Sequence, residues 1–306
     1  MDPNGYSEDI KEKIDRLSRI LFAIGNTKVL RDHLSLYGGT ALNILQMNDP
    51  TRLSEDLDFN YRHFGKDDWG KNRTSIDNTI KRVLNSIGYS DDRIKIHPRY
   101  NLNQFFVRYA TQQGKKDLIK IEIGYMRRIP VLTEDVNIGF RHPSSSTEVL
   151  IMSPREEELY VNKFCTMLSR MRKRPNARDV FDVVTISKLD FDRELFLDLI
   201  MVESILMDLH MDEIEFVPLG RSDLSFLDKL LVKKPDEKEL NKRAKTFTDS
   251  ILSELDKRNI EGFQSEFYES GNVKLDLLHN NEIIHPDISN HPQLLWLRKK
   301  LKIQTK

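Results

Sequence analysis

The sequence predicts an α+β protein, with a mixed β-sheet flanked by helices over residues 1–150 and an all-helical domain over residues 151–306. Three alternating, strand-like runs between residues 93 and 125 predict the sheet. Apolar residues at helical spacing, first over residues 7–24, predict the helices that flank it. Beyond residue 150 the patterns become almost entirely helical, so we expect two domains of different architecture.

The elements of the first domain are predicted in chain order. Ser7, followed by two acidic residues, is suited to begin the first helix. Residues 33–37 are typical of a short strand, and Gly38-Gly39 of a tight turn. The remaining elements that we expect are a helix over 40–47, a strand over 56–61, a helix over 71–87, three strands within 93–125 and a short apolar run over 147–152.

The second domain is expected to begin with a helix that has Ser153 as its N-cap. Pro154 and three glutamates then occupy the first turn, where proline and acidic residues are favourable. Further helical patterns lie within 191–209, 239–258 and 291–301, and the charged stretch 233–239 is typical of a solvated linker. The sequence therefore predicts a helical bundle for this half of the chain.

The composition excludes several classes of protein. The 306 residues contain 48 Lys plus Arg and 48 Asp plus Glu, and this balance argues against a globally basic nucleic-acid binder. The single cysteine, Cys165, excludes a disulfide framework and a four-cysteine zinc site. No apolar run approaches the roughly 18–20 residues of a membrane helix, and no signal peptide is visible. We therefore expect a cytoplasmic protein with no membrane partner.

Two aspartates on one strand are the first candidate site. If residues 56–61 form a strand, Asp56 and Asp58 point to the same face, while Leu57 and Phe59 point to the core. Neighbouring carboxylates repel unless a cation lies between them, and hard oxygen ligands suit Mg²⁺. The alternative is a solvated strand end or a helix cap.

The glycines before this strand indicate a phosphate site. A strand, a glycine turn and a helix start at Thr40 would gather free backbone N–H groups, which bind phosphate readily. Gly38 and Gly39 would let a phosphate approach the backbone closely. No Lys-Ser/Thr follows them, so the segment is not a P-loop. A lone glycine pair is more often an ordinary turn, but beside Asp56 and Asp58 it indicates a nucleoside triphosphate with Mg²⁺.

A third carboxylate is available on a separate strand. Alternation over residues 118–123 places Glu122 on one face with Lys120, and three isoleucines on the other. Glu122 is therefore a candidate metal ligand, or a base for an attacking hydroxyl. The alternative is an ordinary exposed strand residue.

Together these motifs resemble the abortive-infection nucleotidyltransferase toxins of the AbiEii/AbiGii type, in the DNA polymerase beta-like superfamily. Gly38-Gly39-Thr40 with Arg52-x-Ser54-x-Asp56-Leu-Asp58 is similar to that family's first motif, and the strand with Glu122 to its second. Wider relatives have Gly-Ser where this chain has Gly39-Thr40. The third and fourth motifs are matched by Glu157-Glu158-x-x-x-x-Lys163 and Arg178-Asp179-x-x-Asp182.

The resemblance implies a role for each matched residue. Asp56 and Asp58 would bind two Mg²⁺ ions, with Glu122 as third ligand or base. Gly38, Gly39 and Thr40 would hold phosphates, assisted by Arg52, Ser54 and Lys163. Asp179 or Asp182, in the helical domain with Lys163, would support the site or the incoming base. The alternatives are a surface ion pair of Lys163 with Glu157 or Glu158, and helix capping or pairing with Arg178 for the aspartates.

Two basic clusters are candidate nucleic-acid surfaces. The first contains Arg170, Arg172, Lys173, Arg174 and Arg178, and the second contains Lys299, Lys300 and Lys302. Runs of charge are usually solvated faces. The first cluster, however, lies between the third and fourth motifs, where it could hold an RNA backbone through its phosphates.

The sequence thus predicts a Mg²⁺-dependent enzyme that moves a nucleoside monophosphate from an NTP to an acceptor hydroxyl. The resemblance implies the toxin of a toxin–antitoxin or phage-defence pair, with a cognate antitoxin. Some members of the family modify the 3′ end of tRNA, and tRNA is therefore the expected acceptor. The alternatives are nucleotidylation of a protein or small molecule, and a catalytically silent module that binds NTP or RNA.

Overall fold

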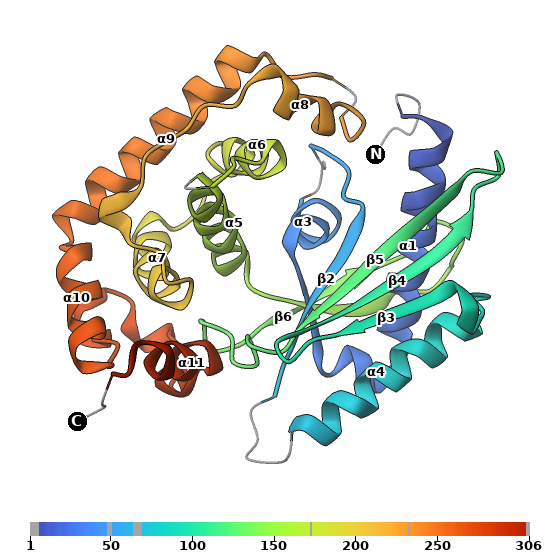
Figure 1. The fold of residues 1–306 in the computed structure, drawn as a ribbon, viewed down its shortest axis with the longest axis horizontal. Helices are drawn as coiled ribbons and strands as arrows, with labels where there is room; N and C mark the ends of the chain where they lie inside the picture. Colours follow the sequence, from blue (N-terminus) through green and yellow to red (C-terminus); the bar gives the residue numbers. More distant parts are fainter. Residues whose placement is uncertain (1–5, 48–50, 64–68, 172, 232, 304–306) are drawn as a thin grey trace. The chain divides into compact units, whose positions relative to one another are not determined.

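The computed structural model describes residues 6–47, 51–63, 69–171, 173–231 and 233–303. It divides the chain into two compact units (Figure 1). The first, the sheet unit, contains residues 1–129 and 135–154, and the second, the helical unit, contains 130–134 and 155–306. The division falls after Pro154 rather than after residue 150, and a short internal segment of the first half belongs to the helical unit.

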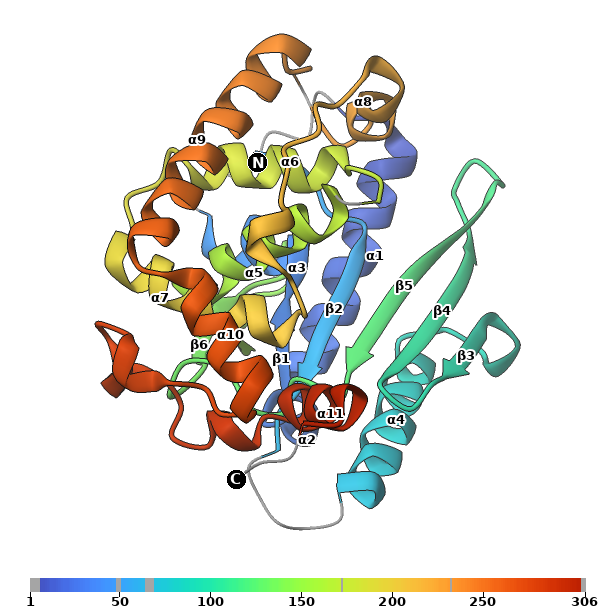
Figure 2. The same cartoon turned by 60° about the vertical axis from the view of Figure 1, so that its left-hand side comes forward.

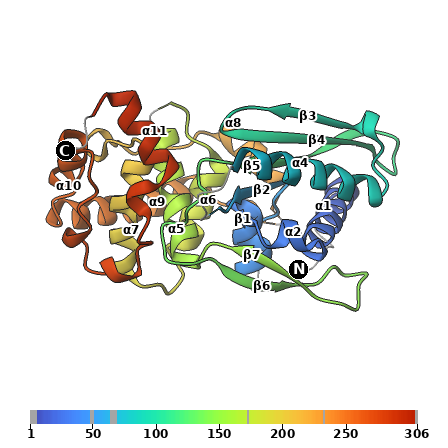
Figure 3. The ribbon, with the colours of Figure 1, turned by 90° about the horizontal axis from the view of Figure 1, so that it is seen from below.

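The sheet unit is built on one mixed seven-stranded sheet of order β3-β4-β5-β2-β1-β7-β6. Its parallel pairs are β2 with β5 and β1 with β7, and all other neighbours are antiparallel. Figure 2 shows β1, β2, β5, β4 and β3 side by side, and Figure 3 shows β7 and β6 beyond β1. The strands are β1 Leu34–Tyr37, β2 Asp56–Tyr61, β3 Ile94–Pro98, β4 Leu102–Ala110, β5 Lys116–Gly124, β6 Val136–Phe140 and β7 Val149–Ser153.

The central strands have one apolar and one polar face, as their alternation predicts. Leu57 and Phe59 of β2 are fully buried with the alternate isoleucines of β5, so burial of this face holds the sheet in register. In Figure 1, α1 (Glu8–Asn26) and α4 (Trp69–Ser86) lie on one side of β2, β4 and β5, and α3 (Gly38–Thr40) lies on the other side of β2. A four-residue helix, α2 (Lys28–Arg31), joins α1 to β1.

Three local predictions were wrong or incomplete. No separate turn precedes the helix at the glycines, because α3 begins at Gly38 and continues as a π-helix over Ala41–Gln46. Ser153 is the last residue of β7 rather than an N-cap, and the next helix begins at Glu156. Strand β6 was not anticipated, because a sequence such as VNIGF gives only a short alternation interrupted by glycine.

The helical unit is organised around a buried central helix, α7, in which every residue from Leu195 to Leu206 is buried. Helices α5, α9, α10 and α11 pack against it (Figure 3). Residues 130–134 add a short bridge between Leu132 and Ile284. The helices are α5 Glu156–Met171, α6 Ala177–Ile186, α7 Arg193–Leu206, α8 Arg221–Asp228, α9 Glu237–Lys257, α10 Ile260–Ser270 and α11 Pro292–Leu301.

The α+β fold class is therefore confirmed. The stretch 233–239 is only in part a linker, because α9 already begins at Glu237 and Asp236 accepts a hydrogen bond from the Glu239 N–H. None of the helices in the described ranges combines the length and apolar character that crossing a membrane requires.

A buried ion pair fixes the end of β2, the strand that holds the two candidate aspartates. Arg62 donates Nε and Nη2 to the two carboxylate oxygens of Asp135, at 2.7 and 2.9 Å, and Nη1 to the Arg127 carbonyl at 2.7 Å. The side chains of Arg62 and Asp135 are only 1% and 4% exposed. Removing one member would leave the other charge buried without this partner.

We expect Arg62→Met to lower the free energy of unfolding by about 3–5 kcal/mol, the usual cost of breaking a buried pair. Urea denaturation measures this change. Arg19→Met is the matched control, because Arg19 pairs with Asp15 on an exposed surface, where such pairs contribute about 1 kcal/mol or less. Equal losses for both variants would contradict a special role for Arg62.

Candidate active site

A row of polar side chains crosses four strands of the sheet unit. Tyr37 of β1 lies opposite Asp58 of β2, Asp58 opposite Glu122 of β5, and Glu122 opposite Gln104 of β4. Residues paired across strands share a face, so these four side chains occupy the polar face. The pairing of β2 with β5 therefore brings Glu122 beside Asp58, on the face where alternation predicted Asp56 and Asp58.

Three carboxylates lie in this region, on Asp56, Asp58 and Glu122, and we call them the carboxylate set. Lys120 lies opposite Asp56 in the register of β2 and β5. Its Nζ donates to Glu122 Oε2 at 2.8 Å and lies 3.9 Å from Asp56 Oδ2. Gln104 Nε2 donates to the other Glu122 oxygen at 2.5 Å. One ammonium group thus faces the carboxylates at this position.

The environment keeps Glu122 ionised. Burial opposes its ionisation, but hydrogen bonds from Lys120 and Gln104 outweigh burial and hold the pKa of Glu122 below its ordinary value. The Asp58 carboxyl group also hydrogen-bonds to Glu122. Two acidic groups in contact need a proton or a cation between them.

Gly38 is required where the chain passes Asp58. Its φ of +74° is in the left-handed region, and a Cβ at this position would lie 2.7 Å from Asp58 Oδ2. A Cβ on Gly39 would lie 2.7 Å from Arg52 Nη2 and 2.9 Å from Ser54 Oγ. The two glycines therefore let the helix start pack directly against the residues of the first motif.

The other predicted phosphate-binding side chains are buried. Thr40 is fully buried, and its hydroxyl donates to the Asp56 carbonyl. Arg52 is 2% exposed and donates Nη1 to the Leu53 carbonyl at 2.8 Å, and Ser54 is 7% exposed. In this arrangement the Thr40 hydroxyl is engaged and is not available to a phosphate. Thr40 thus fixes the start of β2 beside the helix.

The carboxylate set fits a magnesium ion by its chemistry, because all three donors are hard oxygens. It is not preassembled: within the described ranges, no three His, Cys, Asp or Glu side chains are gathered as a metal site requires. The ammonium of Lys120 lies between Asp56 and Glu122 instead. Metal binding by Asp56, Asp58 and Glu122 therefore stays a prediction.

In the helical unit, two ion pairs join α5 to α6. Lys163 Nζ lies 2.9 Å from Asp182 Oδ2, and these side chains are 9% and 1% exposed. Arg170 pairs with Asp179, about one turn earlier on α6. Each aspartate therefore pairs with a residue of α5. Asp182 is the aspartate that holds Lys163, which the sequence could not decide.

The first basic cluster is divided by its surroundings. Lys173 and Arg174, between α5 and α6, are exposed and have no ion-pair partner in the part of the chain that the structure describes. Arg178 is half-buried at the start of α6, and Arg170 is paired as described above. Arg172 lies outside the described residues. Lys173 and Arg174 are thus the members best placed to contact an anion.

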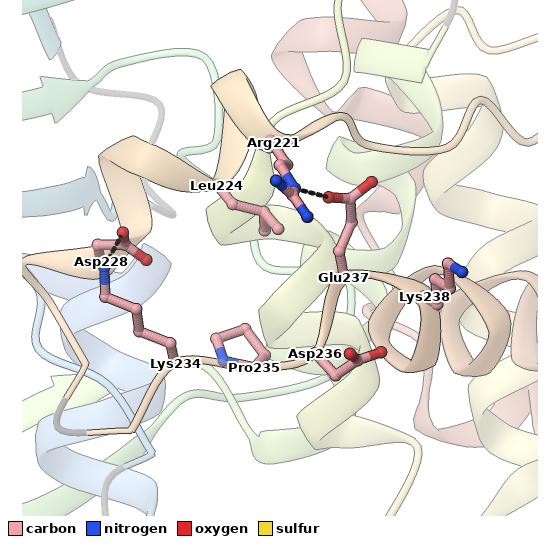
Figure 4. Close-up of a pocket in the computed structure, with 8 residues that line it drawn as sticks. All are labelled: Arg221, Leu224, Asp228, Lys234, Pro235, Asp236, Glu237 and Lys238. Carbon is pink, nitrogen blue, oxygen red and sulfur yellow. Dashed lines mark hydrogen bonds and ion pairs between the residues drawn. The ribbon is translucent and has the colours of Figure 1, made fainter.

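An open pocket of about 540 Å³ lies elsewhere in the helical unit, between α8 and α9 (Figure 4). Its charged side chains include the ion pairs Arg221–Glu237 and Lys234–Asp228. Neither Lys163 nor any other predicted site residue lines it. The pocket therefore contributes nothing to the candidate active site.

Comparison with known proteins decides the family. Residues 19–277 match the family described as nucleotidyl transferase AbiEii toxin, type IV toxin–antitoxin system. The chain belongs to this family. It is therefore a nucleotidyltransferase and an AbiEii-type toxin, and the resemblance to this family is confirmed. No curated protein matches the chain in sequence.

One solved structure supports the fold of this AbiEii-type toxin. MenT4, a nucleotidyltransferase toxin from Mycobacterium tuberculosis H37Rv, superposes with a TM-score of 0.55 at 18% identity, over 82% of this chain and 87% of MenT4. An antigenic nucleotidyltransferase-like protein from Paracoccidioides brasiliensis gives a TM-score of 0.38 at 16% identity, over 74% of this chain and 96% of that protein. The likeness to MenT4 supports the fold alone.

Sequence reasoning missed two neighbours of the carboxylate set in this AbiEii-type toxin. Gln104 contacts Glu122 from β4, and Tyr37 faces Asp58 from β1. Burial, then the charge of Asp58, raise the pKa of Tyr37. Both residues are uncharged and lie outside the recognised motifs. Only the strand register identifies them as neighbours of the carboxylates, and the sequence pattern does not fix that register.

We expect Gly38→Ala to destabilise the toxin more than Gly88→Ala does. Both glycines have positive φ, so a Cβ costs each about 1–2 kcal/mol. Only at Gly38 does the Cβ also meet Asp58, which adds about 1–3 kcal/mol of overpacking, whereas nothing lies within 4 Å at Gly88. Urea denaturation of both variants measures the difference, and equal losses would contradict the close approach.

Proposed function

We propose that this toxin transfers a nucleoside monophosphate from an NTP to a hydroxyl group at the 3′ end of tRNA, in a Mg²⁺-dependent reaction. The observation that carries the proposal is the carboxylate set beside the Gly38–Thr40 helix start. Hard anionic ligands next to the first N–H groups of a helix are suited to a metal–triphosphate complex. The family match supports the reaction class.

Asp56, Asp58 and Glu122 are the residues that would hold the metal ions. Bound Mg²⁺ supplies neutralisation of the triphosphate and stabilises the attacking and leaving oxygens. Asp56 and Asp58 are held in place by β2, whose two ends are fixed by Thr40 and by Arg62. The ionised state of Glu122 suits either a third ligand or a base that accepts the proton of the acceptor hydroxyl.

The triphosphate is assigned to the backbone of Gly38, Gly39 and Thr40, and to Lys163. The N–H groups at the start of a helix attract phosphate oxygens. A lysine is a compact charge suited to phosphate, and Asp182 holds the side chain of Lys163 in one place. On this proposal, Arg52 and Ser54 support the start of the helix, because their side chains lie close to Gly39.

RNA as the acceptor is supported by the exposed charges of Lys173 and Arg174, for which the described part of the chain provides no ion-pair partner. Such side chains neutralise backbone phosphates without reading the bases. On this proposal the toxin acts in the cytoplasm, where its RNA acceptor and its cognate antitoxin would both be present, and it serves in abortive infection.

We expect Asp56→Asn to lower nucleotide transfer by roughly a hundredfold or more, because loss of a metal ligand removes several kcal/mol of stabilisation. The assay incubates protein, Mg²⁺, total tRNA and each α-labelled NTP in turn. Asp92→Asn is the control, because Asp92 is an exposed aspartate of the same unit that should leave transfer unchanged.

The same assay separates the alternatives. Label on tRNA that depends on Asp56 supports the proposal and identifies the nucleotide. Asp56-dependent label on protein or on a small molecule would move the acceptor to that class. Equal labelling by wild type and Asp56→Asn would contradict the assigned site, and no label with any acceptor would favour a silent binding module.

We expect a Lys173→Ala, Arg174→Ala double variant to raise the KM for RNA and to flatten its dependence on salt. The slope of log affinity against log salt should fall by about 1 for each phosphate contact that is lost. The KM for NTP should not change. A Lys299→Ala, Lys302→Ala variant removes the same charge from the second basic cluster, and an equal effect of that variant would contradict a specific surface at the α5–α6 junction.

A further inference from the structure

Lys120 occupies the position between the carboxylates that the proposed metal ions would need. The register sets Lys120 directly opposite Asp56, and Glu122 follows on the same face of β5. The Nζ of Lys120 lies 2.8 Å from Glu122 Oε2 and 3.9 Å from Asp56 Oδ2. Among the described ion pairs, Lys120 is thus the cation shared by both strands of the carboxylate set.

The position of Lys120 is imposed by the sheet. Neighbouring strands lie about 4.8 Å apart, so paired residues of β2 and β5 meet side by side. The Lys120 side chain is 27% exposed, and those of Asp56 and Glu122 are 26% and 18% exposed. Acidic groups gathered in a half-buried site are costly to keep ionised, and a cation at this point offsets that cost.

The same position sets Lys120 in competition with a metal ion. Mg²⁺ requires the oxygens that Lys120 now contacts, and two cations about 4 Å apart repel strongly where water is partly excluded. The charge of Lys120 is carried on a flexible four-carbon stem, so its head group can move while its backbone stays in the sheet. A triphosphate would offer the displaced ammonium a new anionic partner.

We propose that Lys120 is a positioning residue that holds the carboxylate set together in the metal-free toxin and couples metal binding to nucleotide binding. Metal alone binds weakly because Lys120 opposes it. Metal that arrives with a triphosphate binds more tightly, because the phosphates accept the ammonium that leaves the carboxylates. This inference rests on the proposed metal-dependent function and adds to it the order in which the site is filled.

The test is calorimetric titration of the full-length protein with Mg²⁺, without nucleotide and with a non-hydrolysable NTP analogue. We expect Lys120→Met to bind Mg²⁺ alone about tenfold more tightly than wild type, and the nucleotide to increase Mg²⁺ affinity less in the variant. In chelator, the melting temperature of Lys120→Met should fall below that of wild type, and added Mg²⁺ should close the gap.

Matched variants separate charge from packing. Lys116→Met removes a lysine from the same face of the same strand, where Lys116 is exposed and has no ion pair in the described part of the chain, so its Mg²⁺ affinity should equal that of wild type. Lys120→Arg keeps the charge and should retain weak Mg²⁺ binding. Lys120→Gln is neutral but can still donate to Glu122, so it repeats the test if the methionine variant does not fold.

The outcomes distinguish this inference from the function on which it rests. Unchanged or weaker Mg²⁺ binding by both neutral Lys120 variants, with transfer still dependent on Asp56 and metal, would overturn the role of Lys120 alone. Transfer by wild type in chelator would overturn the proposed metal dependence, and the inference with it. Tighter binding by the neutral variants, but not by Lys116→Met, would support the proposal.

Discussion

The crowding of the acidic groups of Asp56, Asp58 and Glu122 on one face of β2 and β5 is the constraint that the rest of the sheet unit must offset. Three acidic groups on two adjoining strands are unfavourable in a half-buried site, and the fold keeps them there by other means. Burial of Leu57, Phe59 and the isoleucines on the opposite face supplies the stabilisation that holds both strands in place. Burial of the apolar face thus keeps the acidic residues together on the opposite face of the sheet.

Supporting contacts restrict how far the acidic strands can move. Thr40 binds the first residue of β2 to the start of the helix. Arg62, which directly follows β2, binds the loop before β6. The strand is therefore fixed at both ends, and the glycine at position 38 lets the helix start lie against Asp58. With the backbone fixed in this way, side chains such as Lys120 are the parts of the site that rearrange when a charged ligand binds.

The sequence was informative where period and chemistry agree. Alternation in residues 56–61 and 118–123 placed the acidic side chains on one face, and the strands β2 and β5 have those faces. The sequence could not supply the pairing of β2 with β5, because this pairing joins segments far apart in the chain. It therefore could not identify Gln104 or Tyr37 as neighbours of the carboxylate set. The start of α5 was misplaced because Ser153-Pro154 suits both a strand end and a helix cap.

The segment 130–134 means that neither unit is a continuous piece of chain. It leaves the sheet unit, pairs with residues near Ile284, and returns before β6 begins. Its N–H groups at Val131 and Leu132 both donate to the buried carboxylate of Glu158, at 3.1 and 3.0 Å. During synthesis this segment is made long before Ile284, its bridge partner, so the helical unit can complete this contact only after residue 284 has left the ribosome.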